Sequence, residues 1–124
     1  MQLQPLVEYL MRHGAPQFLA LIKSAELLPM NDGKMGSHQF QSHKENRRLG
    51  SVAAECEFTD IDGVLVSAAL ILDEDGDPFE IDLWKADFTP LCRWPKSNAI
   101  TVSQHRAQTA EQVGPSGQDP AAKP

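Results

Sequence analysis

The sequence predicts an α+β domain in which two N-terminal helices pack on one face of a three- to four-stranded antiparallel meander sheet. Three observations lead to this fold class. Apolar residues recur with a helical period over residues 3–28, and the period changes to two between residues 52 and 84. The segments with the period of two are also joined by short Asp-Gly turns. Because short connections force neighbouring strands to pair antiparallel, we expect a meander.

Two amphipathic helices are expected at the N-terminus. The first carries apolar side chains at the i, i+3, i+4, i+7 and i+8 positions, namely Leu3, Leu6, Val7, Leu10 and Met11. Gly14 is placed to end this helix, and Pro16 is placed to begin the second one. The second helix has the stripe Phe18, Leu21, Ile22, Ala25 and Leu28. Pro29 ends it, because a proline disfavours helical geometry in the residue before it.

Alternation of apolar and polar residues predicts the sheet. Residues 52–59, 64–72 and 79–84 predict three strands, residues 37–42 predict a short strand before them, and residues 41–50 predict a polar loop. The strand at 64–72 is apolar on both faces, which is typical of a central strand. With the helices on one face, the other face shows an apolar centre surrounded by acids: Leu65, Ala69, Ile71 and Trp84 among Glu55, Glu57, Glu80 and Asp82.

The chain of 124 residues has the length of one domain, which we expect to span residues 1–95. Residues 96–124 have few large apolar groups, and they predict a disordered tail with a frayed helix at 102–112. No apolar run approaches the ~20 residues that cross a bilayer. The N-terminus shows no signal peptide, so a cytoplasmic location without membrane contact is expected.

The charge is unevenly distributed along the chain. The formal net charge is −6, but between residues 55 and 87 there are 11 acidic residues against one base, Lys85. Such a segment repels nucleic acid and attracts a basic partner, although the acids can also serve only to solvate turns and one strand face. Lys44, Arg47 and Arg48 are read as a solvent-exposed loop that is too small to bind nucleic acid.

The leading functional hypothesis is a small, acidic, non-catalytic binding protein for a basic protein partner, as an inhibitor or immunity protein would be. Its predicted binding residues are Trp84, Glu80, Asp82, Glu55 and Glu57. A first alternative is a small-ligand or hydrolytic pocket near Glu80 and Asp82, lined by Asp32, Gly33, Met35 and Ser37. A second alternative is a homodimer formed through the apolar centre of the same sheet face.

The sequence assigns no catalytic residue, metal ligand or cofactor, so a binding protein is favoured over an enzyme. The acidic run at residues 73–77 has its glycine in the fourth position, whereas a calcium loop of the EF-hand type needs it in the sixth. Cys56 and Cys92 have no Cys or His neighbour at zinc-binding spacing. We expect both to be buried free thiols.

Two stretches, at residues 30–37 and 79–91, carry a resemblance to a known family. Their sequences are Met-Asn-Asp-Gly-Lys-Met-Gly-Ser and Phe-Glu-Ile-Asp-Leu-Trp-Lys-Ala-Asp-Phe-Thr-Pro-Leu. They resemble small bacterial proteins classed as a domain of unknown function, which have a DGG-MGS box and an E-L-D-x-W-K-x-D-F-S-P-L box, over roughly residues 5–95. This chain departs from the boxes at Lys34, where glycine is usual, and at Thr89, where serine is usual. The resemblance implies one compact α+β domain and no activity.

Overall fold

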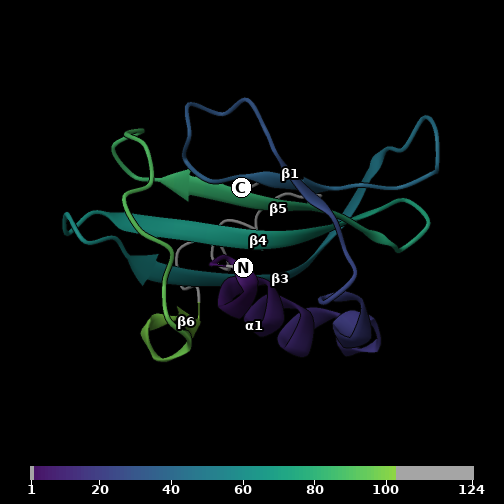
Figure 1. The fold of residues 1–124 in the computed structure, drawn as a ribbon, viewed down its shortest axis with the longest axis horizontal. Helices are drawn as coiled ribbons and strands as arrows, with labels where there is room; N and C mark the ends of the chain where they lie inside the picture. Colours follow the sequence, from purple (N-terminus) through teal and green to yellow (C-terminus); the bar gives the residue numbers. More distant parts are fainter. Residues whose placement is uncertain (1, 103–124) are drawn as a thin grey trace, which may run out of the picture.

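A six-stranded antiparallel sheet dominates the computed structural model, which describes residues 2–102 (Figure 1). The strand order is β1-β2-β5-β4-β3-β6. In chain order the elements are the α-helix α1 (Gln4–Gly14), the 3₁₀ helix η1 (Pro16–Leu21), β1 (Leu27–Pro29), β2 (His38–Phe40), β3 (Leu49–Thr59), β4 (Leu65–Asp73), β5 (Pro78–Lys85), the 3₁₀ helix η2 (Ser97–Ala99) and β6 (Thr101–Val102).

The predicted fold class is wrong, because the described chain has one main helix and is mostly sheet. In place of the second helix it forms η1 and then the edge strand β1. Phe18 and Leu21 are three residues apart, a spacing that suits a 3₁₀ turn as well as an α-helical one. Pro29 lies opposite His38 at the end of β1. An edge strand tolerates a proline, which lacks the N–H needed for pairing on both sides.

The sheet is wider than predicted because the very short strands β1 and β6 were not expected, whereas the short strand predicted at residues 37–42 is present as β2. The central part, β3-β4-β5, pairs as the expected antiparallel meander. The strands β1, β2 and β6 have only two or three residues each, too few to show a period of two. They are added by long-range pairing, with β2 against β5 and β6 against β3.

One face of the sheet carries the hydrophobic core. The helix α1 packs on β3 and β4, and its Leu6, Leu10 and Met11 are fully buried. Gly14 ends α1 against β3: a Cβ at this position would lie 2.2 Å from the carbonyl oxygen of Ala53, so only glycine fits. The segment after β5 crosses the same face as α1 (Figure 1), and its Leu91, Trp94 and Ile100 join the same core.

The described sheet extends past the predicted domain boundary at residue 95. The strand β6 pairs with β3, with Thr101 opposite Glu57 and Val102 opposite Cys56. The predicted helix at 102–112 falls, from residue 103 onward, outside the described residues. Within residues 2–102, no helix combines the length and the apolar character needed to cross a membrane.

Candidate binding face

The strand register places the predicted binding residues on the sheet face opposite α1. Trp84 on β5 lies opposite Ser67 on β4, and Ser67 lies opposite Glu57 on β3. Residues that lie directly opposite one another share a face of the sheet. By the same register, Glu55, Ala69 and Asp82 form a second row. Ile71 and Glu80 form a third row. We call this surface the acidic face, and it comprises Glu55, Glu57, Ser67, Ala69, Ile71, Glu80, Asp82 and Trp84.

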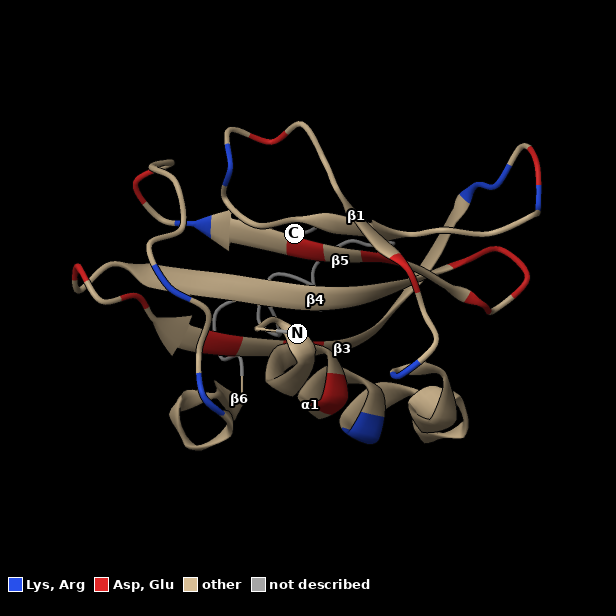
Figure 2. Cartoon of the chain, in the orientation of Figure 1, with Lys and Arg blue, Asp and Glu red and all other residues tan. Residues whose placement is uncertain are grey.

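The centre of the acidic face has small, buried side chains between larger acidic ones. Ala69 has no exposed surface, and Ser67 and Glu57 are 5% and 7% exposed. Glu55 and Asp82 lie on either side of Ala69, and both, like Glu57, have interaction partners. Figure 2 shows acidic residues on β3 and β5 as well as in the turns at both ends of the strands.

Glu80 differs electrostatically from the acids of the turns. Burial raises the pKa of Glu80 above its usual value, and the neighbouring charge of Asp82 raises it further. A raised pKa means that the surroundings disfavour the carboxylate. A cation brought to this part of the acidic face would therefore relieve an existing electrostatic cost.

An aromatic pair stands at one end of the acidic face. The rings of Trp84 and Phe88 lie 5.8 Å apart between centroids, and the two side chains are 47% and 64% exposed. Phe88 has a φ of +64°, a left-handed conformation that is rare for a bulky residue. Asp87 supports this turn, because its Oδ1 accepts hydrogen bonds from the N–H and the hydroxyl of Thr89. These bonds hold the pKa of Asp87 below its usual value.

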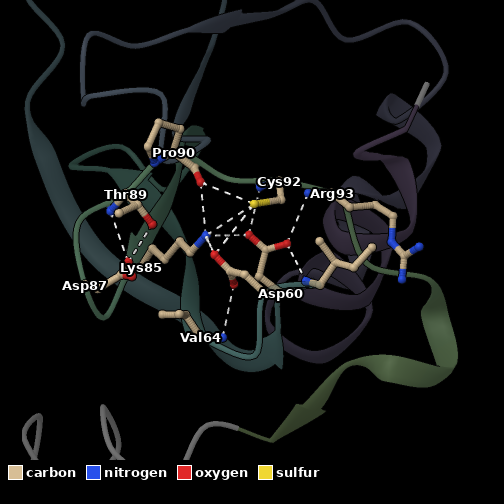
Figure 3. A network of polar contacts seen from close by, with 10 residues as sticks. Asp60, Val64, Lys85, Asp87, Thr89, Pro90, Cys92 and Arg93 are labelled. Atoms are coloured by element: carbon tan, nitrogen blue, oxygen red, sulfur yellow. Dashed lines mark hydrogen bonds and ion pairs between the residues drawn. The ribbon is translucent and has the colours of Figure 1, made fainter.

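At the end of β5, next to Trp84 in the sequence, the side chain of Lys85 is completely buried (Figure 3). Its Nζ lies 2.9 Å from Oδ2 of Asp60 and 2.6 Å from Oδ2 of Asp62, and it donates to the carbonyl of Pro90 at 3.0 Å. Burial by itself would lower the pKa of Lys85, but the two carboxylates outweigh burial and raise it above the usual value. Lys85 is therefore a permanent cation inside the protein.

Asp60 joins three segments of the chain at this point. Besides Lys85, its carboxylate accepts hydrogen bonds from the backbone N–H groups of Ile61, Cys92 and Arg93 (Figure 3). Burial would raise the pKa of Asp60, but these donors and the ammonium together hold it below the usual value. The turn between β3 and β4, the end of β5 and residues 90–93 are thus fixed to one another. We call this cluster the Lys85 network.

The Lys85 network also contains the exposed thiol of Cys92, which corrects the expectation that both cysteines are buried. Its Sγ lies 3.7 Å from Nζ of Lys85 and 3.6 Å from Oδ2 of Asp62. Burial of the sulfur and the charges of Asp60 and Asp62 raise the pKa of the thiol. The two carboxylates and the sulfur could ligate a metal ion, but the ammonium of Lys85 already contacts all three.

A second network lies at the other end of the central strands, and at its centre is a buried anion instead of a buried cation. Asp73 is buried at its centre, with Lys44 Nζ at 2.7 Å and Arg47 Nη2 at 2.9 Å. Its Oδ1 also accepts hydrogen bonds from the N–H groups of Asp75 and Asp77. Burial would raise the pKa of Asp73, but these contacts hold it well below its usual range. We call this cluster the Asp73 network.

The Asp73 network overturns the prediction that Arg47 belongs to a solvent-exposed loop. The side chain of Arg47 is only 9% exposed. Its guanidinium lies 4.6 Å from the ring centroid of Phe79 and donates hydrogen bonds to the carbonyls of Phe40 and Pro78. The basic residues of the loop between β2 and β3 therefore neutralise the chain's own acids.

The residues of the predicted pocket form the connection between β1 and β2. Ser37 donates to the carbonyl of Leu83 at 3.2 Å and to Oδ1 of Asp82 at 3.4 Å, and its hydroxyl accepts the Leu83 N–H. The N–H of Ser37 bonds to Asp32, Gly33 has a φ of +75°, and Met35 is half-buried. The fold thus brings Ser37 and Asp82 into contact.

A cavity of the described chain lies elsewhere. It has a volume of about 420 Å³ between η1 and the loop after β2, and its lining includes Phe18, Phe40 and His43. This cavity and two others in the described chain are lined by neither residues 31–37 nor Glu80 or Asp82. The ligand pocket at these residues stays a prediction.

These features describe a protein built mainly of antiparallel sheet, with one face covered by a helix and the other rich in carboxylates. The chain belongs to the family described as Domain of unknown function (DUF6984), which matches residues 3–95. This confirms the resemblance to an uncharacterised domain family. No curated protein and no solved structure shows significant similarity to the chain. The match ends before η2 and β6, so it includes the whole acidic face but not the strand that borders it at β3.

Proposed function

We propose that this protein is a non-catalytic binding module that engages a basic segment of a protein partner through the acidic face. The observation that carries the proposal is the exposed aromatic pair of Trp84 and Phe88 beside that face. Tryptophan is enriched among the residues that dominate binding energies, and aromatic rings attract the guanidinium of arginine. Carboxylates beside the rings would add charge complementarity and favour a basic partner over an acidic one.

The backbone of Phe88 supports this proposal independently. A bulky residue in the left-handed region carries a conformational cost, and such residues persist where the surroundings hold them in place. Here the N–H of Phe88 bonds to the carbonyl of Lys85, whose side chain is fixed by the Lys85 network. The exposed ring is therefore presented rigidly, and a rigid anchor loses little conformational entropy on binding.

The acids of the acidic face suit this role better than the acids of the turns. Asp60, Asp62 and Asp73 are committed to buried cations of the same chain. Glu80, in contrast, has a pKa that is raised by burial and by Asp82, so it gains from a cation that arrives from outside. An inhibitor or immunity protein is the narrower form of this proposal, and it requires that the basic partner lose activity on binding.

The test uses a fluorescent ten-residue peptide of alternating arginine and alanine as the probe, with binding measured by fluorescence polarisation. We expect Trp84→Ala and Glu80→Lys each to weaken binding by about tenfold, a factor that corresponds to the loss of one interfacial anchor. Leu21→Ala is the matched control, because Leu21 is also an exposed apolar residue but lies in η1, which packs against α1. Equal affinity of the folded Trp84→Ala and Glu80→Lys variants and the unchanged protein would contradict the proposal.

A further inference from the structure

We propose that the acidic face is the docking surface of the chain's own C-terminal segment, residues 103–124, with Arg106 as its main charged contact. A basic partner then competes with this segment for the face. The docking of the segment depends only on the acidic face and the sequence of residues 103–124. The competition between the segment and a basic partner rests on the proposed function.

First, the described core elements pack on only one face of the sheet. The helix α1 and the core residues of the segment after β5 pack on the face opposite to the acidic face. The central strand β4 is apolar on both faces, with Leu65, Ala69 and Ile71 on the side of the acidic face. Strands of this kind are usually covered on both faces. The acidic face is therefore suited to a further layer.

The second argument is where the described chain ends. Thr101 lies opposite Glu57 on the edge of β3, and Val102 lies opposite Cys56. The remaining 22 residues therefore start next to the acidic face. Two strand spacings, from β3 to β5, amount to about 10 Å, and an extended chain covers this distance in about three residues. The segment is long enough to reach every residue of the face.

The third argument is charge complementarity. The acidic face carries four carboxylates and no lysine or arginine among its described residues. The third and fourth residues after Val102 are His105 and Arg106, and the next acid, Glu111, comes only after them. A cation is most stable where several carboxylates surround it at low exposure.

The test is paramagnetic relaxation in the full-length chain. A spin label is attached at Gln108→Cys in a Cys92→Ser background, which removes the exposed thiol and keeps a hydrogen-bond donor. We expect the amide signals of Glu55, Ala69 and Asp82 to lose most of their intensity, while those of α1 keep theirs. Arg106→Glu in the same labelled chain should restore the signals of the acidic face. Lys123→Glu, the matched control at the far end of the segment, should leave the attenuation unchanged.

Each alternative outcome has a distinct meaning. Attenuation that is no stronger on the acidic face than on α1 overturns the docking proposal. Attenuation that also appears when labelled chains are mixed with unlabelled, isotope-enriched chains identifies a second copy as the occupant, and this overturns it as well. The peptide assay then separates the two proposals. If Arg106→Glu releases the segment but the arginine–alanine peptide still fails to bind, the proposed function fails and the docking stands.

Discussion

Each end of the central strands holds one buried charged side chain that is neutralised by residues of opposite charge, a cation at one end and an anion at the other. In the Lys85 network, a buried cation is surrounded by Asp60 and Asp62. In the Asp73 network, a buried anion is surrounded by Lys44 and Arg47. The difference lies in redundancy. Asp73 keeps a cation if either basic partner is lost, whereas Asp60 and Asp62 share a single one.

The comparison shows that many of the acidic residues of this protein have a structural role. Among the residues that the structure describes, acids between positions 55 and 87 form ion pairs with lysines and arginines of the same chain: Asp60, Asp62, Asp73, Asp75 and Asp77. These acids hold turns and loops together. The acids on β3 and β5 instead form the acidic face, where we propose that basic segments bind. The acids thus divide into those that form ion pairs within the chain and those on the face where we propose binding.

The largest effect is expected from Lys85→Met. The substitution leaves the buried carboxylate of Asp60 without its cation, and removing one partner of a buried pair is strongly destabilising. We expect the melting temperature to fall on the order of 10 °C or more, because small domains respond steeply to such losses. Lys44→Met should lower it by only a few degrees, since Arg47 still neutralises Asp73. Thermal unfolding followed by circular dichroism measures both.

Lys23→Met serves as the control for the loss of an exposed lysine, and its melting temperature should match that of the unchanged protein. Equal losses in Lys85→Met and Lys44→Met would show that the Lys85 network is no more dependent on its cation than the Asp73 network. The comparison between a single and a redundant counterion would then be wrong.

An intermediate effect is expected from acid. The folded-state pKa of Asp73 lies well below that of an unfolded aspartate, so its ionisation stabilises the fold above about pH 4 and this stabilisation is lost as the pH falls further. Urea unfolding at pH 7, 5 and 3 should show a steep loss between the last two values. Asp73→Asn should be less stable at pH 7 but lose less between pH 5 and pH 3.

Asp75→Asn is the matched control for the acid experiment, because Asp75 also pairs with Lys44 but is 70% exposed. It should keep the pH dependence of the unchanged protein. A pH dependence in Asp73→Asn as steep as that of the unchanged protein would mean that the buried carboxylate does not drive the acid response.

The smallest effect concerns the chemical reactivity of Cys92. Burial of the sulfur and the two aspartates raise the pKa of this exposed thiol, and the thiolate is the reactive form. We expect alkylation by iodoacetamide at pH 8 to be slower than for a cysteine in a short peptide. Asp62→Asn should speed it up. Mass spectrometry of the peptide that contains Cys92 gives the rate, and a rate equal to that of the free peptide would contradict the electrostatic account.

The central strands were predictable because their sequence alternates over long stretches. The same alternation places Trp84 and Glu80 on one face and Leu83 on the other, which is what the register shows. The short strand predicted at residues 37–42 is present as β2. The short strands β1 and β6 and the 3₁₀ helix η1 were not predicted, because two or three residues carry no period and Phe18 and Leu21 fit two kinds of helix. Long-range pairing, which leaves no local pattern, decides where β2 and β6 lie.

The two networks were missed although one signal pointed to them. Lys85 follows Ile81 and Leu83 at alternate positions of one strand, so its side chain had to point toward the core. A lysine there requires acidic partners, but Asp60 lies 25 residues away and sequence spacing does not reveal it. Arg47 and Asp73 are separated by 26 residues. Lys34 has a φ of +64°, which explains why glycine would suit its position.

The division of the acids into a structural and a binding part is tested most directly by carbon-detected nuclear magnetic resonance of the side-chain carboxyl groups, titrated from pH 7 to pH 2. The account predicts that Asp60, Asp62 and Asp73 titrate below the usual value for aspartate, about 3.9. It predicts that Glu80 titrates above the usual value for glutamate, about 4.3. Titration of Asp60 and Asp73 at or above the usual value, or of Glu80 below it, would contradict the account.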